Sequence, residues 1–176
     1  MLITMNMTSH IVRAELTFRC AVEADIPEVF ALYRSLVGSP YCAWTAEYPG
    51  LQQVCADVAC GALYVMQGPA GLVAAGAIAH LDEHDPLQAW SGKHPCDLLR
   101  FGVARRYQGQ GLGRDFLDRL CCAAAAKQYD TLRILVSATN LPAVTLYRKT
   151  NARYRGDAQS YGIQWHCFER ELKPVQ

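Results

Sequence analysis

A glycine-rich turn between an apolar strand and an amphipathic helix constrains this chain more than any other feature. The turn reads Arg-Arg-Tyr-Gln-Gly-Gln-Gly-Leu-Gly over residues 105–113 and follows the apolar residues 98–103. The helix that it opens is predicted over residues 112–128, with Phe116 and Leu120 on its apolar face. Such a junction points unpaired backbone N–H groups and the positive end of the helix dipole at one place. We therefore expect it to bind phosphate, because glycine lets the backbone approach the oxygens closely.

Two common phosphate-binding motifs fit this turn poorly. A P-loop ends in Gly-Lys-Ser/Thr, whereas this chain continues as Gly113-Arg114-Asp115. The dinucleotide fingerprint needs Gly-x-Gly-x-x-Gly near the first strand and an acidic residue about 20 residues later. Here the spacing is Gly109-x-Gly111-x-Gly113, late in the chain. A glycine turn without a ligand is the third alternative, but three glycines, a glutamine and two arginines at one junction favour a ligand.

The rest of the chain alternates strands and helices, which predicts an α/β fold. Its 176 residues fit one domain of residues 16–176 behind a flexible N-terminal tail, residues 1–15. Residues 82–97 are a polar excursion, and a connection of that length is usually functional or mobile. Strands are expected at 16–19, 63–66, 72–81, 98–103, 132–136, near 154 and at 162–169, and helices from Asp25 to the break at Gly38, within 41–60, and at 112–128 and 142–149.

Two motifs resemble those of the GNAT (GCN5-related) N-acetyltransferase family. Residues 108–113, Gln-Gly-Gln-Gly-Leu-Gly, resemble its Gln/Arg-x-x-Gly-x-Gly/Ala pyrophosphate loop. Residues 140–147 resemble its Asn-x-x-Ala-x-x-Leu-Tyr segment, with one residue more after the Asn, and the likeness extends over residues 16–170. Asn151-Ala152 stands where the family has Gly-Phe. Asn tolerates the left-handed conformation that ends a helix, so we expect this helix end to survive.

The resemblance implies a single-domain GNAT fold. Its sheet would be mixed and mostly antiparallel, with six or seven strands flanked by helices, and its fourth and fifth strands would run parallel and splay apart. It also implies acetyl-CoA as cosubstrate, an amine of a small molecule or peptide as acceptor, and a homodimer as an assembly known in the family. The binding residues carried over are Phe101, Val103, Gln108, Gly109, Gly111, Leu112, Gly113, Asn140 and Tyr147.

Thioester aminolysis needs three groups, and the resemblance suggests candidates for each. The backbone N–H near Val103 would stabilise the oxyanion. Tyr147 would protonate the leaving sulfur or donate a hydrogen bond to it. Asp97, six residues before Val103, would remove the proton of the amine, and the competing bases are His80 and residues 82–85. A domain of the same fold that binds acyl-CoA without catalysis, as a sensor or interaction module, is the alternative function.

Composition argues against several other classes of protein. The formal net charge is +1, which gives no strong field toward nucleic acid or membrane. No apolar run or leader predicts membrane insertion or export, so a cytoplasmic protein is expected. The eight cysteines include no Cys-x-x-Cys pair, and they are interpreted as structural thiols. His80, His84 and His94 are interpreted as surface histidines, so no metal is expected.

Overall fold

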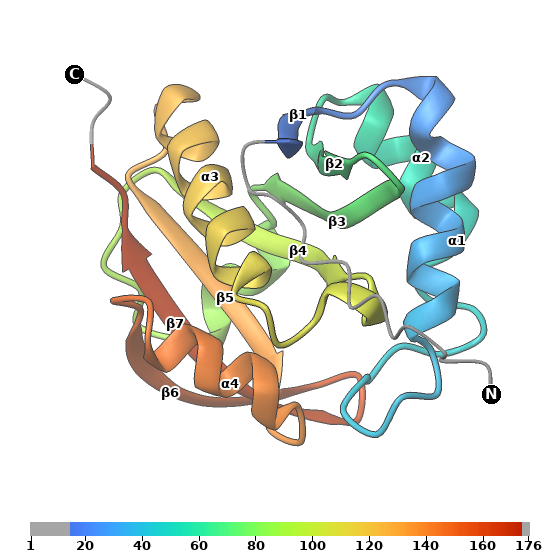
Figure 1. Ribbon diagram of the computed structural model, residues 1–176. Helices are drawn as coiled ribbons and strands as arrows, with labels where there is room; N and C mark the ends of the chain where they lie inside the picture. Colours follow the sequence, from blue (N-terminus) through green and yellow to red (C-terminus); the bar gives the residue numbers. More distant parts are fainter. Residues whose placement is uncertain (1–14, 174–176) are drawn as a thin grey trace, which may run out of the picture.

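A seven-stranded sheet runs through the computed structural model, which describes residues 15–173 (Figure 1). The strands pair in the order β1-β2-β3-β4-β5-β7-β6, and every neighbouring pair is antiparallel except β4 and β5. The predicted mixed sheet with one parallel pair is therefore confirmed. The strands are β1 (Thr17–Cys20), β2 (Leu63–Gly68), β3 (Gly71–Ala79), β4 (Pro95–Val103), β5 (Thr131–Ser137), β6 (Arg153–Ser160) and β7 (Ile163–Glu171).

Helices cover both faces of this sheet and bury a separate core on each. Helices α1 (Ile26–Leu36) and α2 (Leu51–Ala59) pack on one face, against β2, β3 and β4. Helices α3 (Leu112–Ala126) and α4 (Leu141–Arg148) pack on the other face. Short 3-10 turns between the helices and strands are η2 (Glu23–Asp25), η3 (Asp82–Leu87) and η4 (Arg105–Tyr107).

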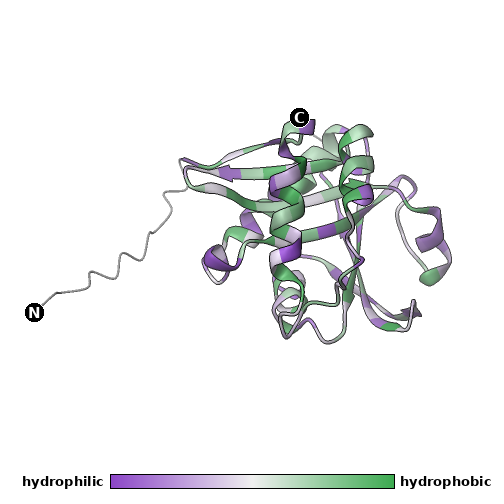
Figure 2. Ribbon diagram, turned by 90° about the vertical axis from the view of Figure 1, so that its right-hand side faces the viewer, coloured by the Kyte–Doolittle hydropathy of each residue, from purple (hydrophilic) through white to green (hydrophobic). Residues whose placement is uncertain are grey.

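The amphipathic pattern of α3 explains why it lies where it does. Phe116, Leu117 and Leu120 recur at helical spacing and are fully buried. Burying each such side chain stabilises the fold by about 1.5–3 kcal/mol. In Figure 2 hydrophobic residues follow the central strands, and hydrophilic residues lie mostly on outlying turns and helix surfaces. The apolar face of α3 thus holds the glycine turn at its N-terminus against the end of β4.

The parallel strands β4 and β5 diverge halfway along their length. Their pairing ends at Leu98↔Ile134, although β4 continues to Val103 and β5 to Ser137. A bulge accompanies the divergence: the register of β3 with β4 shifts here, and Arg100 adopts a φ of 48°. The predicted splay between these two strands is present.

Several local predictions need correction. Strand β4 begins at Pro95, so Asp97 lies inside the strand, and the excursion is shorter than expected and contains η3. Asp25 occupies the N-cap position of α1, as predicted, but its side chain makes no capping hydrogen bond. Its carboxylate instead accepts hydrogen bonds from Arg19 at 2.6 and 2.8 Å and from the N–H of Val22 at 2.8 Å. The left-handed Asn151 is confirmed, with a φ of 58°.

Two further expectations concern the ends of the chain and membranes. The predicted tail, residues 1–15, lies outside the described residues except for Glu15. Within residues 15–173, no helix has both the length and the apolar character that crossing a bilayer requires.

Candidate active site

The glycine turn ends in a helix whose N-terminus is open. Gly109 and Gly111 have φ values of 74° and 79°, a conformation that side chains disfavour. Gly111 is the N-cap of α3 and supplies no side-chain hydrogen bond. The N–H groups of Leu112, Gly113 and Arg114 therefore have no acceptor within the described part of the chain. These donors and the helix dipole are suited to hold a pyrophosphate.

Two glutamines hold the shape of the turn. The amide of Gln108 donates to the carbonyl oxygen of Val103 at 2.9 Å. The amide of Gln110 donates to the carbonyl oxygen of Arg106, also at 2.9 Å. Gln108 therefore supports the backbone of the turn, and its role in cofactor binding stays a prediction.

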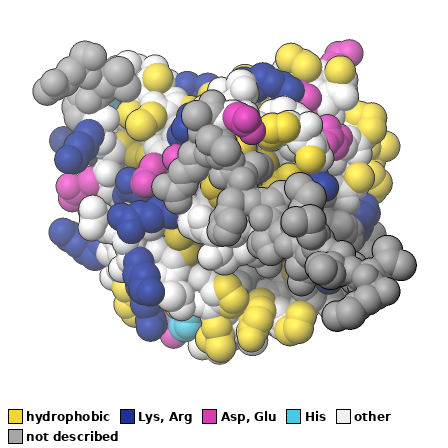
Figure 3. Space-filling model, in the orientation of Figure 1, with side chains coloured by type: hydrophobic (Ala, Val, Ile, Leu, Met, Phe, Trp, Pro, Cys, Tyr) yellow, Lys and Arg dark blue, Asp and Glu magenta, His cyan; other side chains and the backbone are white. Residues whose placement is uncertain are grey.

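Positive side chains surround this end of the molecule. Figure 3 shows Lys and Arg gathered on the side where α3 and α4 lie. Arg114 on α3 and Arg148 on α4 are exposed, as is Lys149 directly after α4. They add to the attraction for an anionic ligand.

Val103 presents its backbone to the space between the splayed strands. The N–H of Ala104 donates to Val73 on β3 at 2.9 Å, and Val103 pairs with Ala74. Because backbone groups alternate in direction along a strand, the N–H of Val103 points away from β3. Its carbonyl oxygen, which accepts from Gln108, points the same way. This is the orientation that an oxyanion donor or an anchor for a bound acyl chain requires.

Tyr147 lies on the α4 side of the splay. It is 4% exposed, and its ring packs against Phe101 on β4 and Phe168 on β7, with centroid distances of 6.5 and 6.2 Å. Burial raises the pKa of Tyr147, so the phenol stays protonated and can act as a hydrogen-bond donor. The structure thus brings Phe101, Val103 and Tyr147 together beside the glycine turn.

Asn140 begins α4. Its side-chain oxygen accepts from the N–H of Ala143 at 3.2 Å, so it is the N-cap of the helix. The capping uses only the oxygen, and the amide N–H₂ keeps its capacity to donate.

Asp97 lies on the opposite face of β4, at the centre of a buried charge network. It is 1% exposed and forms an ion pair of 2.6 Å with Arg133 on β5, which is equally buried. Its Oδ1 contacts Nδ1 of His84 at 2.7 Å and Nε of Arg133 at 3.1 Å. Its Oδ2 accepts from the N–H of Leu81 at 2.9 Å and from Nη2 of Arg133. All four lone-pair positions are occupied, which disfavours direct proton removal by Asp97.

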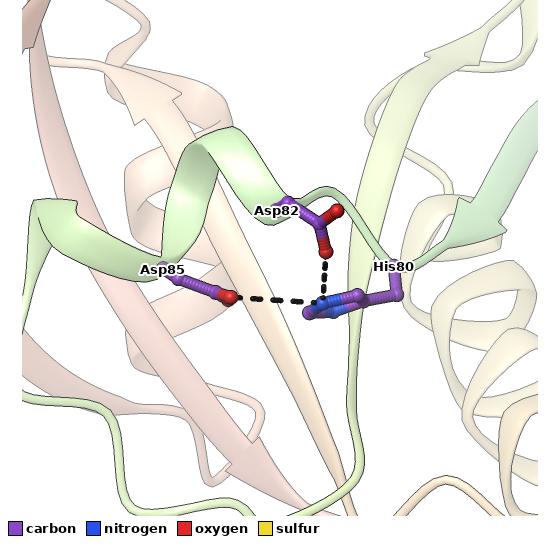
Figure 4. Close-up of side chains that lie close together, drawn as sticks. All are labelled: His80, Asp82 and Asp85. Atoms are coloured by element: carbon purple, nitrogen blue, oxygen red, sulfur yellow. Dashed lines mark ion pairs between the residues drawn. The ribbon is translucent and has the colours of Figure 1, made fainter.

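Residues at the start of the excursion extend this network. His80 Nδ1 lies 3.1 Å from Nη2 of Arg133, and its Nε2 lies 3.0 Å from Asp82 and 3.8 Å from Asp85 (Figure 4). Asp85 also accepts from Arg133 at 2.5 Å, and this hydrogen bond lowers its pKa. His80, Asp82 and Asp85 are close enough together to be considered as a metal cluster. The guanidinium of Arg133 already supplies the cation there, and we assign no metal to them.

Motif reasoning did not identify Arg133, although its contacts hold this network together. Burial alone would lower its pKa, but its hydrogen bonds to Asp97 and Asp85 raise the pKa overall. Its guanidinium also lies 5.6 Å from the ring centre of Trp90. The signal in the sequence is an arginine inside the apolar run Leu132–Val136. An unpaired charge there would be costly, so the run itself indicates a buried partner.

A second buried ion pair stands at the bulge. Arg100 donates to both oxygens of Asp57 on α2 at 2.6 Å each, and to the hydroxyl of Tyr48 at 3.3 Å. Burial raises the pKa of Asp57, while the hydrogen bonds from Arg100 oppose that shift. The pair fixes the bulged residue of β4 against α2 and the loop before it.

Comparison with known proteins agrees with this geometry. Residues 29–151, more than half of the chain, match the acetyltransferase (GNAT) family. The chain belongs to the GNAT acetyltransferase family. No curated protein matches the GNAT chain in sequence.

Solved structures support the fold of this GNAT protein. A GNAT-family acetyltransferase from Streptococcus agalactiae has a TM-score of 0.74 at 17% identity, over 94% of this chain and 99% of that one. A Salmonella typhimurium protein, solved with its cofactor acetyl-CoA, has a TM-score of 0.70 at 16% identity, over 92% and 96%. The ribosomal-protein-S18-alanine N-acetyltransferase from Escherichia coli has a TM-score of 0.70 at 15% identity, also over 92% and 96%. At these identities the likeness concerns the fold alone.

Proposed function

We propose that this protein transfers the acetyl group of acetyl-CoA to a primary amine of a small molecule or peptide. The observation that carries the proposal is the open N-terminus of α3, placed beside the splay that Val103 and Tyr147 border. Membership of the family and a similar fold solved with acetyl-CoA support the choice of cosubstrate. The Escherichia coli structure is that of a ribosomal-protein-S18-alanine N-acetyltransferase, and it does not identify the acceptor used here.

The proposed reaction is direct attack of the amine on the thioester carbon. The turn of residues 109–114 holds the pyrophosphate, and the acyl end reaches the splay. The N–H of Val103 stabilises the oxyanion as the C–N bond forms. The C–S bond then breaks, and the hydroxyl of Tyr147 donates its proton or a hydrogen bond to the leaving sulfur. The amine must lose a proton, because an alkylamine with a pKa of about 10.4 is almost wholly protonated at neutral pH.

The cytoplasm is the proposed location, and small amines or peptides are the proposed partners. All eight cysteines are free thiols, which fits a reducing compartment. A homodimer stays a prediction, which sedimentation of the purified protein tests.

Binding of the cosubstrate can be tested with a pair of variants that differ only in charge. Gly111→Asn and Gly111→Asp place side chains of equal size in the turn, and both residues tolerate a left-handed conformation. Because the carboxylate of Gly111→Asp would face the pyrophosphate, we expect it to bind CoA at least about 10-fold more weakly than Gly111→Asn. Isothermal titration calorimetry measures the difference. Equal affinities would contradict the site, and wild-type preference for a nicotinamide dinucleotide would contradict the class of enzyme.

Transfer is tested with acetyl-CoA and a panel of amino acids, polyamines and short peptides with free N-termini. The acetylated product should be followed by mass spectrometry, since exposed Cys20, Cys55, Cys60 and Cys122 would consume a thiol reagent. Acetylation of at least one amine supports the proposal. CoA binding without transfer to any amine would favour the non-catalytic acyl-CoA-binding module.

A further inference from the structure

The ring of His84 contacts the buried carboxylate of Asp97, which was predicted to be the base. Nδ1 of His84 lies 2.7 Å from Oδ1 of Asp97, and the His84 side chain is 13% exposed. We propose that His84 is the general base for the amine, with Asp97 as its positioning residue. The proposal rests on the proposed acetyl transfer, and it assigns the proton-removing step to a residue outside both sequence motifs.

The hydrogen bonds of Asp97 determine the tautomer of His84. Asp97 is paired with Arg133 at 2.6 Å and, as a carboxylate, can only accept hydrogen bonds. Nδ1 of His84 must therefore carry the hydrogen in this contact. In the neutral ring the lone pair is then on Nε2, which has no hydrogen-bond partner among residues 15–173 and is not a buried atom. Nε2 is free to take a proton.

The backbone and neighbours of His84 hold the ring in place. Its N–H donates to Leu81 at 3.0 Å, and its carbonyl oxygen accepts from the indole of Trp90 at 2.9 Å. Trp90 in turn lies near the guanidinium of Arg133. A base fixed in this way loses little freedom on reaching the transition state.

His80, the other histidine of the network, is less suited to the role. Its Nδ1 faces Nη2 of Arg133, which can only donate, and its Nε2 faces Asp82 at 3.0 Å. Both ring nitrogens are thus engaged, and Nε2 carries the hydrogen. The charged and titratable groups around His84 are Asp97 on β4, Arg133 on β5, His80 after β3 and Asp85 on η3.

His84 also lies on the side of the sheet from which an acceptor has to come. Leu98 faces the core under α3 and α4, so Asp97 next to it points to the opposite face. Helices α3 and α4 pack on the first face, and the core that α1 and α2 bury on the second face includes, within the described residues, no residue of β5. We therefore place the amine on the second face, beside β5. Asp97 lies three residues, or about 10 Å, before the bulge at Arg100. The base role requires the acceptor amine to lie within hydrogen-bond reach of Nε2, directly or through one water.

The proton balance of the step is as follows. The ammonium group gives one proton to Nε2 of His84, and the neutral amine forms the C–N bond. The nitrogen loses a second proton as the C–S bond breaks, and the sulfur gains one, which yields the amide and the CoA thiol. One proton in total passes from His84 to solvent.

The decisive variant is His84→Asn. Its side-chain amide can replace the Nδ1–H donor to Asp97, but it cannot accept a proton. With the amine from the panel that is acetylated fastest, we expect kcat/KM at neutral pH to fall by about 10²–10⁴-fold. The rate should recover as pH rises, because more amine is then already neutral. CoA affinity should stay within a few-fold, and added imidazole should partly restore His84→Ala.

His94→Asn is the control. His94 is an exposed histidine just before β4, at the end of that strand opposite the splay, and its ring makes no hydrogen bond among residues 15–173. The rate and pH profile of this variant should equal those of the wild type. Nitrogen NMR of the imidazoles provides an independent readout: the His84 signal should show hydrogen on Nδ1 and an unprotonated Nε2 in the neutral ring.

The outcomes separate this inference from the proposed function. A wild type that acetylates amines, with His84→Asn unchanged in rate and pH profile, would overturn the base role alone. Hydrogen on Nε2 of neutral His84 would do the same. A wild type that binds CoA and acetylates no amine would overturn the proposed function, and the base role with it.

Discussion

Two buried tyrosines differ in whether the hydroxyl would have a hydrogen-bond partner in the proposed reaction. Tyr147 lies beside the splay, where a bound thioester would supply a partner for its proton. Tyr33 on α1 is 0% exposed, and its hydroxyl has no hydrogen-bond partner among the described residues. Burial raises the pKa of both groups, so both are protonated at neutral pH. Only Tyr147 is placed to use that proton in the proposed reaction.

Tyr147→Phe should lower kcat by at least about 10²-fold, because the leaving sulfur loses its donor. The aromatic ring and its contacts with Phe101 and Phe168 remain, so CoA affinity should change by no more than a few-fold. Steady-state kinetics and calorimetry measure the two quantities. A variant of near-normal kcat would remove Tyr147 from the mechanism.

Tyr33→Phe should change the stability of the protein and not its activity. It removes a buried hydroxyl that has no partner, so the free energy of unfolding should rise by about 1 kcal/mol while kcat is unchanged. Urea denaturation at neutral pH measures the stability. A loss of stability would mean that the hydroxyl has a bonding role that the described contacts do not include.

At this scale the sequence predicted local features well and distant contacts poorly. The glycines of the turn and the left-handed Asn151 follow from local backbone chemistry, which neighbouring residues specify. The surroundings of Asp97 do not, because His84 and Arg133 lie 13 and 36 residues away in the chain. No periodicity brings these three together, and only the folded sheet does.

At the scale of elements, the segment between β3 and β4 is the most distinctive part of the molecule. It lies over the face of the sheet opposite α3 and is tied down along its length. The buried carboxylate of Glu169 on β7 accepts from the N–H groups of Ser91 and Gly92 at 2.9 and 3.2 Å and from the Ser91 hydroxyl at 2.6 Å. A Cβ atom on Gly92 would lie 1.8 Å from Oγ1 of Thr131, so the backbone fits closely against β5.

Glu169→Gln tests this attachment. The amide replaces one acceptor oxygen with a donor, so one of the hydrogen bonds from Ser91 or Gly92 is lost, at a cost of about 1–3 kcal/mol in local stability. Amide hydrogen exchange at these two residues should therefore accelerate about 10-fold or more. Glu171→Gln, on the same strand but exposed, is the control and should leave exchange unchanged. Equal protection in both variants would mean that Glu169 does not hold the segment.

The elements themselves were largely predictable, apart from this segment. Helical spacing and apolar runs placed the helices and strands within a few residues, because each buries one face against the sheet. The segment was expected only as a polar excursion. Its fold depends on carboxylates supplied by Glu169 and Asp130, which are far away in sequence and carry no local signal.

At the scale of the whole molecule, buried thiols link stability to pH. Cys96 and Cys121 lie under the sheet in the core that α3 covers, and Cys167 is buried on β7. Burial raises the pKa of Cys121 and Cys167 to about 11, and that of Cys96 further. In the unfolded chain a cysteine has a pKa of about 8.5. The folded state therefore keeps protons that the unfolded state releases at alkaline pH.

The sign of the effect follows from proton linkage. Below about pH 8.5 these thiols are protonated in both states and stability does not depend on them. Between about pH 8.5 and the folded pKa of about 11, the unfolded state binds fewer protons, so stability falls as pH rises. For Cys121 alone the loss should reach about 2 kcal/mol at pH 10.

Urea denaturation under reducing conditions, at intervals from pH 7 to pH 10, gives the profile. Cys121→Ala should lose less stability over this range than the wild type, whereas Cys122→Ala, which removes the adjacent exposed thiol, should follow the wild-type profile. Parallel profiles for all three proteins would show that the Cys121 thiol does not govern alkaline unfolding.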